Sequence, residues 1–230
     1  MKIKQESIIT LYNNNLFSLV PNVPVGNDTF LLFPTSPLGM ILKPKYHIIH
    51  PMGQSRYKIY EPTHPHFITL TVFHWIPLFT NQNSVKILLN SFKYLQNSDN
   101  QKIYAYAYVI LENHLHLVVS SDNLLKTIKK FKSYTAKKLL ELLQKQNVKT
   151  ILDQLAFYKK AHKKETTYQI WQEGMQPKLI QNEKTMIQKI EYIHNNPVKR
   201  GYVDEAICWR YSSARDYNGT QGLIEVEKLW

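Results

Sequence analysis

The 230-residue sequence predicts an α+β fold in which an antiparallel sheet is covered by helices, and two patterns carry this prediction. Short runs rich in aromatic and β-branched residues are typical of strands, and they lie at residues 67–73, 103–111 and 114–119. Longer runs with apolar residues three and four apart are typical of helices, and they lie at residues 84–96, 123–146 and 184–195. The resulting order is strand–helix–strand–strand–helix, with a further helix near the end.

Local signals support the individual elements. Only Glu112-Asn113 separates the second and third strand-like runs, which predicts a hairpin. The helix over residues 123–146 has its leucines on one arc and most of its lysines on the opposite arc. We expect an irregular, lysine-rich connection up to Trp171. The last helix should end before Pro197, because the residue that precedes a proline disfavours helical geometry.

Residues 1–54 differ in texture from the rest of the chain. Prolines and asparagines interrupt the short apolar runs, so no helical or alternating period is sustained. We therefore expect an irregular N-terminal extension and a single globular domain over residues 55–230. Because the regular pattern begins after Met52, we hypothesise that Met52 is the natural start and that residues 1–51 are not native. An intact terminus at Met1 in mass spectrometry would contradict this.

The composition limits the function classes. A formal net charge of +12 favours a polyanionic partner, and the basic residues are mostly lysines, which suit backbone phosphates better than base edges. The single cysteine excludes a disulfide framework and a cysteine-based zinc site. We find no signal-peptide core and no apolar run long enough to span a bilayer, so we expect a soluble, cytoplasmic protein with no membrane partner.

His114-Leu115-His116 is the first candidate site. Side chains alternate along a strand, so both imidazoles point to the same side. Burying two adjacent imidazoles is costly unless something joins them. A metal-binding pair and a buried structural pair both fit this pattern. His64 and His66 have the same spacing, but we expect them to be edge residues that bind no metal.

Tyr192 is the second candidate, because its position on the last helix is unusual for a packing residue. It lies about 150° from the centre of the apolar arc, and Asn196 lies about 40° from Tyr192, with Lys189 on the same side. Tyr134 is its rival, since it also lies off the apolar arc of its helix, where it could stack on a base or contact a phosphate. The lysines around it form either a solvated face or a phosphate-tracking surface: Lys126, Lys129, Lys130 and Lys137.

Residues 106–119, ending in Leu-Glu-Asn-His-Leu-His-Leu-Val-Val, resemble the metal-binding segment of the HUH superfamily of single-strand DNA nucleases, where U is a hydrophobic residue. Two further segments extend this resemblance: Tyr-Ile-His-Asn-Asn-Pro-Val-Lys at 192–199 and Trp-Arg-Tyr-Ser-Ser-Ala at 209–214. With these segments, the chain is similar to REP-associated tyrosine transposases of the insertion sequence 200-like family. The resemblance covers residues 57–229. Glu112 departs from it, since many relatives have proline there, and we expect it to alter the hairpin turn and not the ligands.

The resemblance implies a ferredoxin-like sandwich with helices on one face of the sheet and both histidines on a central strand. It implies an enzyme that cleaves and rejoins hairpin-bearing single-stranded DNA. His114 and His116 would bind Mg²⁺ or Mn²⁺ with Asn196 as a third ligand. Tyr192 would attack the phosphorus, leaving a 5′-phosphotyrosine link and a free 3′-hydroxyl.

Further expectations follow from the same resemblance. Because the phenol of tyrosine has a pKa of about 10 in model peptides, the nucleophile needs activation by the metal or by a lysine, for which Lys189 and Lys199 are the candidates. The lysine-bearing helix and Tyr134 would hold the DNA strand. Monomer and homodimer both stay open.

Three alternatives remain. A replication initiator or relaxase would share the chemistry, but those proteins usually carry further domains. The chain could also be a domesticated or inactive single-stranded nucleic-acid-binding protein. A metal hydrolase without a covalent step would keep the histidines but would not need an outward-facing tyrosine.

Overall fold

The computed structural model describes residues 61, 63–99, 102–159 and 166–228. The strands are β1 (His66–Thr71), β2 (Tyr104–Ile110), β3 (His114–Ser120) and β4 (Lys178–Leu179). The α-helices are α1 (Gln82–Gln96), α2 (Leu124–Lys145), α3 (Lys149–Phe157), α4 (Glu183–Lys199) and α5 (Ala214–Tyr217). The predicted N-terminal extension over residues 1–54 lies outside the described residues, so its boundary stays a prediction. Among the helices described, none is long and apolar enough to cross a membrane.

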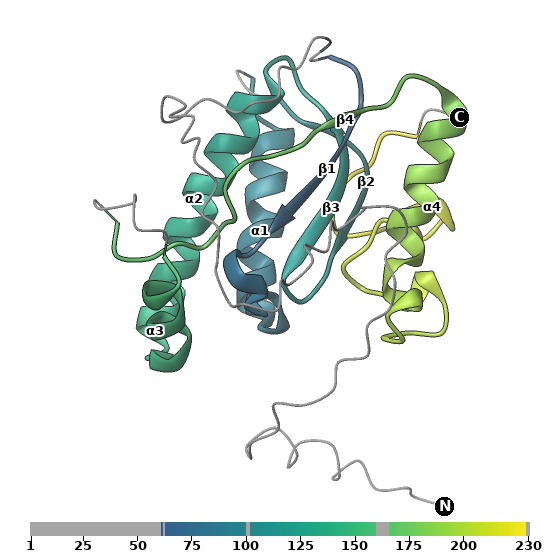
Figure 1. Cartoon of the computed structure of the whole chain (residues 1–230). Coiled ribbons are helices and arrows are strands. Elements are labelled where there is room, and N and C mark those ends of the chain that lie inside the picture. The colour runs from purple at the N-terminus through teal and green to yellow at the C-terminus, as the bar shows by residue number, and fades with distance from the viewer. Residues whose placement is uncertain (1–60, 62, 100–101, 160–165, 229–230) are drawn as a thin grey trace, which may run out of the picture. The chain divides into compact units, whose positions relative to one another are not determined.

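The four strands form one antiparallel sheet in the order β2-β3-β1-β4. With α1 between β1 and β2, and α2 between β3 and β4, this is the ferredoxin-like arrangement that the resemblance implies. The predicted hairpin is confirmed: the Leu111 amide donates to the His114 carbonyl at 2.9 Å across the turn. The histidine-bearing strand β3 therefore lies inside the sheet, between β2 and β1 (Figure 1).

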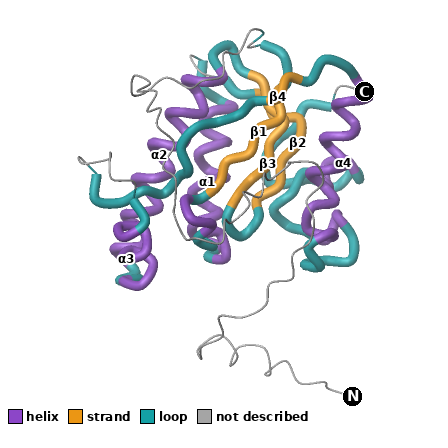
Figure 2. The backbone as a smooth tube through the Cα atoms, in the orientation of Figure 1, coloured by secondary structure: helices purple, strands orange, loops and turns teal. Residues whose placement is uncertain are grey.

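Helices cover both faces of the sheet (Figure 2). Leu70 and Leu117 belong to an apolar cluster with α1 and α2, whereas Phe67 and Val118 belong to a second cluster with α4. The expectation of helices on one face therefore holds for α1 and α2 only. Every residue of β3 is buried, so side chains on both faces of the sheet are covered.

Asparagine side chains cap the N-termini of α1 and α2. Asn81 accepts a hydrogen bond from the Asn83 amide before α1, and Asn123 accepts one from the Lys126 amide before α2. The connection beyond α2 is more regular than expected, because it contains α3. Leu152 and Leu155 are buried and anchor this short helix to the cluster of α1 and α2.

Helix α4 continues past Pro197 to Lys199, so the predicted end before the proline is wrong. Proline removes one amide donor, but the following turn is still made, since the Arg200 amide donates to the Asn196 carbonyl at 3.2 Å. The chain leaves the helix through Gly201, whose φ of 69° is a left-handed conformation that glycine adopts without strain. The extra turn brings Asn196 and Arg200 to one side of the helix.

Candidate active site

His114 and His116 lie on the face of β3 that α4 covers, since Val118 on the same side of the strand packs in the cluster of that helix. Their ring centroids are 4.9 Å apart, and the residues are only 3% and 6% exposed. The prediction that both imidazoles point to the same side is confirmed. The prediction for the other pair is wrong in one respect, because His66 is buried in β1 and is not an edge residue.

Each imidazole of the pair is held through Nδ1. The Nδ1 of His116 is 2.8 Å from the Thr69 hydroxyl on the neighbouring strand. The Nδ1 of His114 donates to Asn113 Oδ1 at 2.6 Å, and the amide is oriented by its second bond, from Nδ2 to the Trp75 carbonyl at 3.1 Å. Metal-binding histidines typically use one ring nitrogen in this way and present the other to the ion. Both Nε2 atoms are thus suited to ligation.

The protonation state also suits a metal. Burial lowers the pKa of His114 to about 4, and the charge of Arg200 contributes to the shift. Burial likewise lowers the pKa of His116 to about 3, together with the effects of His114 and Arg200. Both imidazoles are therefore neutral near pH 7, which is the form that binds metals.

Helix α4 brings Tyr192 to the histidines. The ring centroid of Tyr192 is 5.3 Å from that of His116. Phe67 contacts both rings, with centroid distances of 5.8 Å to Tyr192 and 5.5 Å to His116. Tyr192 remains 39% exposed, so the ring is packed on one side and open to solvent on the other. The structure thus joins the two candidate sites of the sequence into one group.

Two lysines flank the tyrosine. The Nζ atoms of Lys189 and Lys199 each lie 5.9 Å from the centroid of the Tyr192 ring. Lys189 lies one turn before the tyrosine and Lys199 two turns after it, on the same helical face. Their charges favour an anion such as a phosphate beside the tyrosine.

Asn196 behaves differently from Tyr192. It is buried at 8% exposure, not open to solvent, because the Arg200 side chain lies against it, with Nε donating to Asn196 Oδ1 at 3.3 Å. Arg200 continues to Glu112 Oε1 at 2.7 Å, which ties the hairpin turn to the end of α4. In the described part of the chain, no group of three or more histidine, cysteine, aspartate or glutamate residues could hold a metal. The role of Asn196 as a third ligand stays a prediction.

Sequence reasoning missed Thr69, Asn113 and Arg200. A signal exists for two of them: Asn113 directly precedes His114, and Arg200 follows Asn196 by one helical turn. Thr69 has no such signal, since only the strand register places it opposite His116.

The chain matches no protein-family model. A curated protein of Haemophilus influenzae, named "Putative REP-associated tyrosine transposase", is 28% identical over 131 residues, which are 54% of this chain and 68% of that protein. A solved structure described as "Structure of the REP associates tyrosine transposase bound to a REP hairpin" has the same fold, with a TM-score of 0.52 and 17% identity. The match covers 77% of this chain and 94% of that one.

The chain is thus similar in sequence to a protein named as a REP-associated tyrosine transposase, and it shares the fold of another. The resemblance drawn from the sequence motifs is thereby confirmed. In this chain, the tyrosine of the motifs on α4 lies in contact with one histidine of the pair on β3, His116.

The predicted DNA-binding residues fall into two sets. Lys189 and Lys199 adjoin the tyrosine, as described above. The others lie on α2, across the sheet from α4, and all are exposed: Lys126, Lys129, Lys130, Tyr134 and Lys137. A strand held by α2 would therefore have to pass around the end of the sheet to reach Tyr192.

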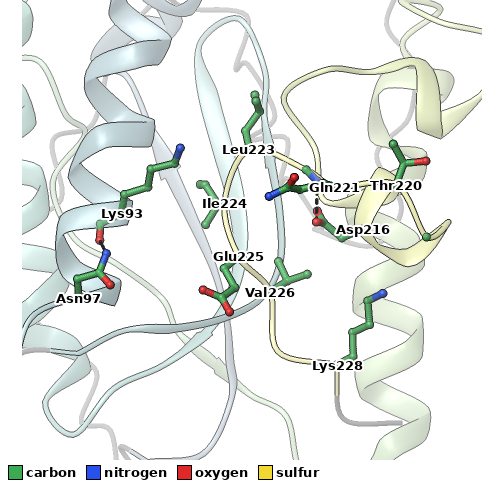
Figure 3. A pocket seen from close by; sticks show the side chains of 12 residues that line it. Lys93, Asn97, Asp216, Thr220, Gln221, Leu223, Ile224, Glu225, Val226 and Lys228 are labelled. Atoms are coloured by element: carbon green, nitrogen blue, oxygen red, sulfur yellow. Dashed lines mark hydrogen bonds between the residues drawn. The ribbon is translucent and has the colours of Figure 1, made fainter.

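A cavity of about 700 Å³ lies elsewhere, between α1 and the C-terminal segment (Figure 3). Lys93 and Asn97 line it from α1, and residues 216–228 supply the other side. None of the candidate site residues lines it. The cavity is separate from the histidine–tyrosine group.

Proposed function

We propose that this chain is a metal-dependent transposase that cleaves and rejoins hairpin-bearing single-stranded DNA through a tyrosine. One observation carries the proposal: α4 packs Tyr192 directly against His116 of the buried, neutral histidine pair, with the two ring centroids 5.3 Å apart. This contact brings an exposed phenol to an imidazole whose Nδ1 is already held by Thr69. The relationship to REP-associated tyrosine transposases supports the same reading.

His114 and His116 would hold the metal through Nε2, with the amide oxygen of Asn196 as the third donor. Two nitrogen donors suit Mn²⁺ better than Mg²⁺, which prefers an all-oxygen shell. The bound ion would polarise the scissile phosphate and stabilise the departing oxygen. Thr69 and Asn113 would keep the imidazoles in the binding orientation.

In the cleavage step the Tyr192 oxygen would attack the phosphorus. The phenol gives up its proton as the bond between phosphorus and the phenolic oxygen forms; the bond from phosphorus to O3′ breaks, and the 3′ oxygen takes up a proton, so no net proton is gained or lost. Lys189 and Lys199 would bind the phosphate oxygens beside the ring. Attack of another 3′-hydroxyl on the phosphotyrosine reverses the step, so rejoining needs no nucleotide cofactor.

The partner proposed is a DNA hairpin with single-stranded flanks. The related structure is described as bound to a REP hairpin, which supports this class of DNA. The net charge of +12 is consistent with a nucleic-acid partner.

The test uses hairpin-bearing single-stranded DNA with Mn²⁺ and separates products under denaturing conditions. A label at the 3′ end should stay with the protein, and a label at the 5′ end should leave on a fragment that a polymerase can extend. Tyr192→Phe should abolish the adduct, whereas Tyr134→Phe, which changes another exposed tyrosine, should retain it.

Other outcomes would contradict the proposal. Cleavage by Tyr192→Phe would indicate a hydrolase without a covalent step. Binding without cleavage by the unchanged protein would indicate a nucleic-acid-binding protein that has lost catalysis. An adduct on the 5′-labelled fragment would reverse the proposed polarity.

A further inference from the structure

The loop that follows β1 has an unusual backbone beside the histidines. His74 and Trp75 are consecutive non-glycine residues with positive φ, 52° and 57°. The left-handed region is unfavourable for residues with a side chain, and such strain is kept where the surroundings impose it, often at functional sites. Despite this cost, the loop presents the indole of Trp75 to solvent, with 57% of the residue exposed.

Asn113 couples this loop to the histidine pair. Its Nδ2 donates to the Trp75 carbonyl, and its Oδ1 accepts from His114 Nδ1. The Trp75 ring stands edge-on to the ring of His114, with the centroids 5.6 Å apart. One amide side chain therefore holds both the backbone of Trp75 and the imidazole of a candidate metal ligand.

The exposed rings continue away from the site. The ring of His74 stacks on that of Tyr158, with a centroid distance of 4.0 Å and an interplanar angle of 17°. Tyr158 in turn contacts Phe157, at 5.1 Å. We call Trp75, His74, Tyr158 and Phe157 the aromatic strip. Tyr158 and Phe157 are 41% and 82% exposed, so burial in the core does not account for these positions.

The aromatic strip touches elements on both faces of the sheet. Its inner end, Trp75, adjoins His114 on the α4 side of the sheet, whereas its outer end, Phe157 and Tyr158, lies at the C-terminal end of α3, which packs with α1 and α2. It therefore extends from His114 to the end of α3.

We propose that the aromatic strip stacks the unpaired bases of the DNA strand and that Trp75 is the platform for the base next to the scissile phosphate. The proposal deepens the proposed function and rests on it, because it places that phosphate between the histidine pair and Tyr192. Every base has an aromatic face, so such a platform binds single strands with little sequence preference. A second protein would also cover exposed rings, but a platform that shares Asn113 with a metal ligand suits a group that must be aligned with the chemistry.

The test measures binding, not cleavage, and uses the full-length chain with Tyr192→Phe so that the DNA stays intact. The probe is a hairpin oligonucleotide with a single-stranded oligo-dT flank that carries 2-aminopurine at one position after another. Stacking should quench the fluorescence at one or two neighbouring positions. Trp75→Ala should remove this quenching and weaken binding about 5- to 100-fold, whereas Trp75→Phe should keep most of both.

Two controls make the test specific. Tyr94→Ala removes an exposed ring on α1, 74% exposed, and should change neither signal. An abasic site at the quenched position should weaken binding by the parent protein but not further weaken binding by Trp75→Ala. If the abasic site and Trp75→Ala weaken binding additively, or if 2-aminopurine is quenched at no position, the proposal is overturned.

The outcome is distinguishable from that of the proposed function. An unchanged protein that forms the covalent adduct while Trp75→Ala binds and reacts equally well would overturn the platform alone. Site-specific quenching without any adduct would support the platform and contradict the proposed catalysis. Failure of the probe to bind would contradict both.

Discussion

The buried histidine pair makes the stability of the metal-free protein depend on pH. In the unfolded chain a histidine titrates near pH 6.5, whereas in the fold the pKa of His114 is lowered to about 4 and that of His116 to about 3. Between these values the unfolded chain binds more protons than the folded one. The contribution to stability is therefore complete above about pH 6.5 and is lost as the pH falls toward the folded pKa values.

The size of the effect follows from the same values. Between pH 7.5 and pH 5.5, each histidine should cost about 1.4 kcal/mol of unfolding free energy, so the pair should cost about 3 kcal/mol. Glutamine does not titrate in this range. The variant with both His114→Gln and His116→Gln should therefore lose about 3 kcal/mol less than the unchanged protein over this interval.

Urea unfolding at the two pH values, with a chelator present, measures this difference. His194 provides a matched control, because it is partly buried on α4 with its pKa lowered to about 4, but it bonds to Ser213 and lies outside the pair. His194→Gln should reduce the pH effect by about 1.4 kcal/mol and leave stabilisation by Mn²⁺ unchanged. A double variant at His114 and His116 that loses as much stability as the unchanged protein would refute the reasoning.

Three further predictions address the surroundings of the pair. Thr69→Val removes the hydroxyl that holds His116 and should weaken Mn²⁺ binding about 10- to 100-fold by calorimetry; unchanged affinity would show that this bond does not orient the ligand. Arg200→Gln leaves the partly buried Glu112 carboxylate without its ionic partner and should cost about 1–3 kcal/mol in urea unfolding, an effect that Glu112→Gln added to it should relieve. The logarithm of the affinity for single-stranded DNA falls linearly with the logarithm of the salt concentration, and Lys199→Gln should make this slope shallower by about 0.7. An unchanged slope would show that Lys199 contacts no phosphate.

The sequence predicted the local elements well where the pattern was strong. The two strand-like runs on either side of Glu112-Asn113 predicted the hairpin, and the apolar spacing over residues 123–146 predicted α2. Elements that depend on their neighbours were missed. The two-residue strand β4 exists only because it pairs with β1, and α3 is held by two buried leucines. The predicted end of the last helix before Pro197 was wrong, because the next turn of α4 forms although proline lacks an amide donor: the Arg200 amide still donates to the Asn196 carbonyl.

What the sequence determined by itself was the list of reactive groups and the side of each element on which they lie. Period two along a strand puts His114 and His116 together, and the helical period turns Tyr192 away from the core of its own helix. Only the tertiary structure decided that α4 packs on the histidine face of the sheet, that Thr69 lies opposite His116, and that Arg200 buries Asn196. These relations join residues distant in the chain or depend on which surfaces pack together, and no local periodicity encodes them.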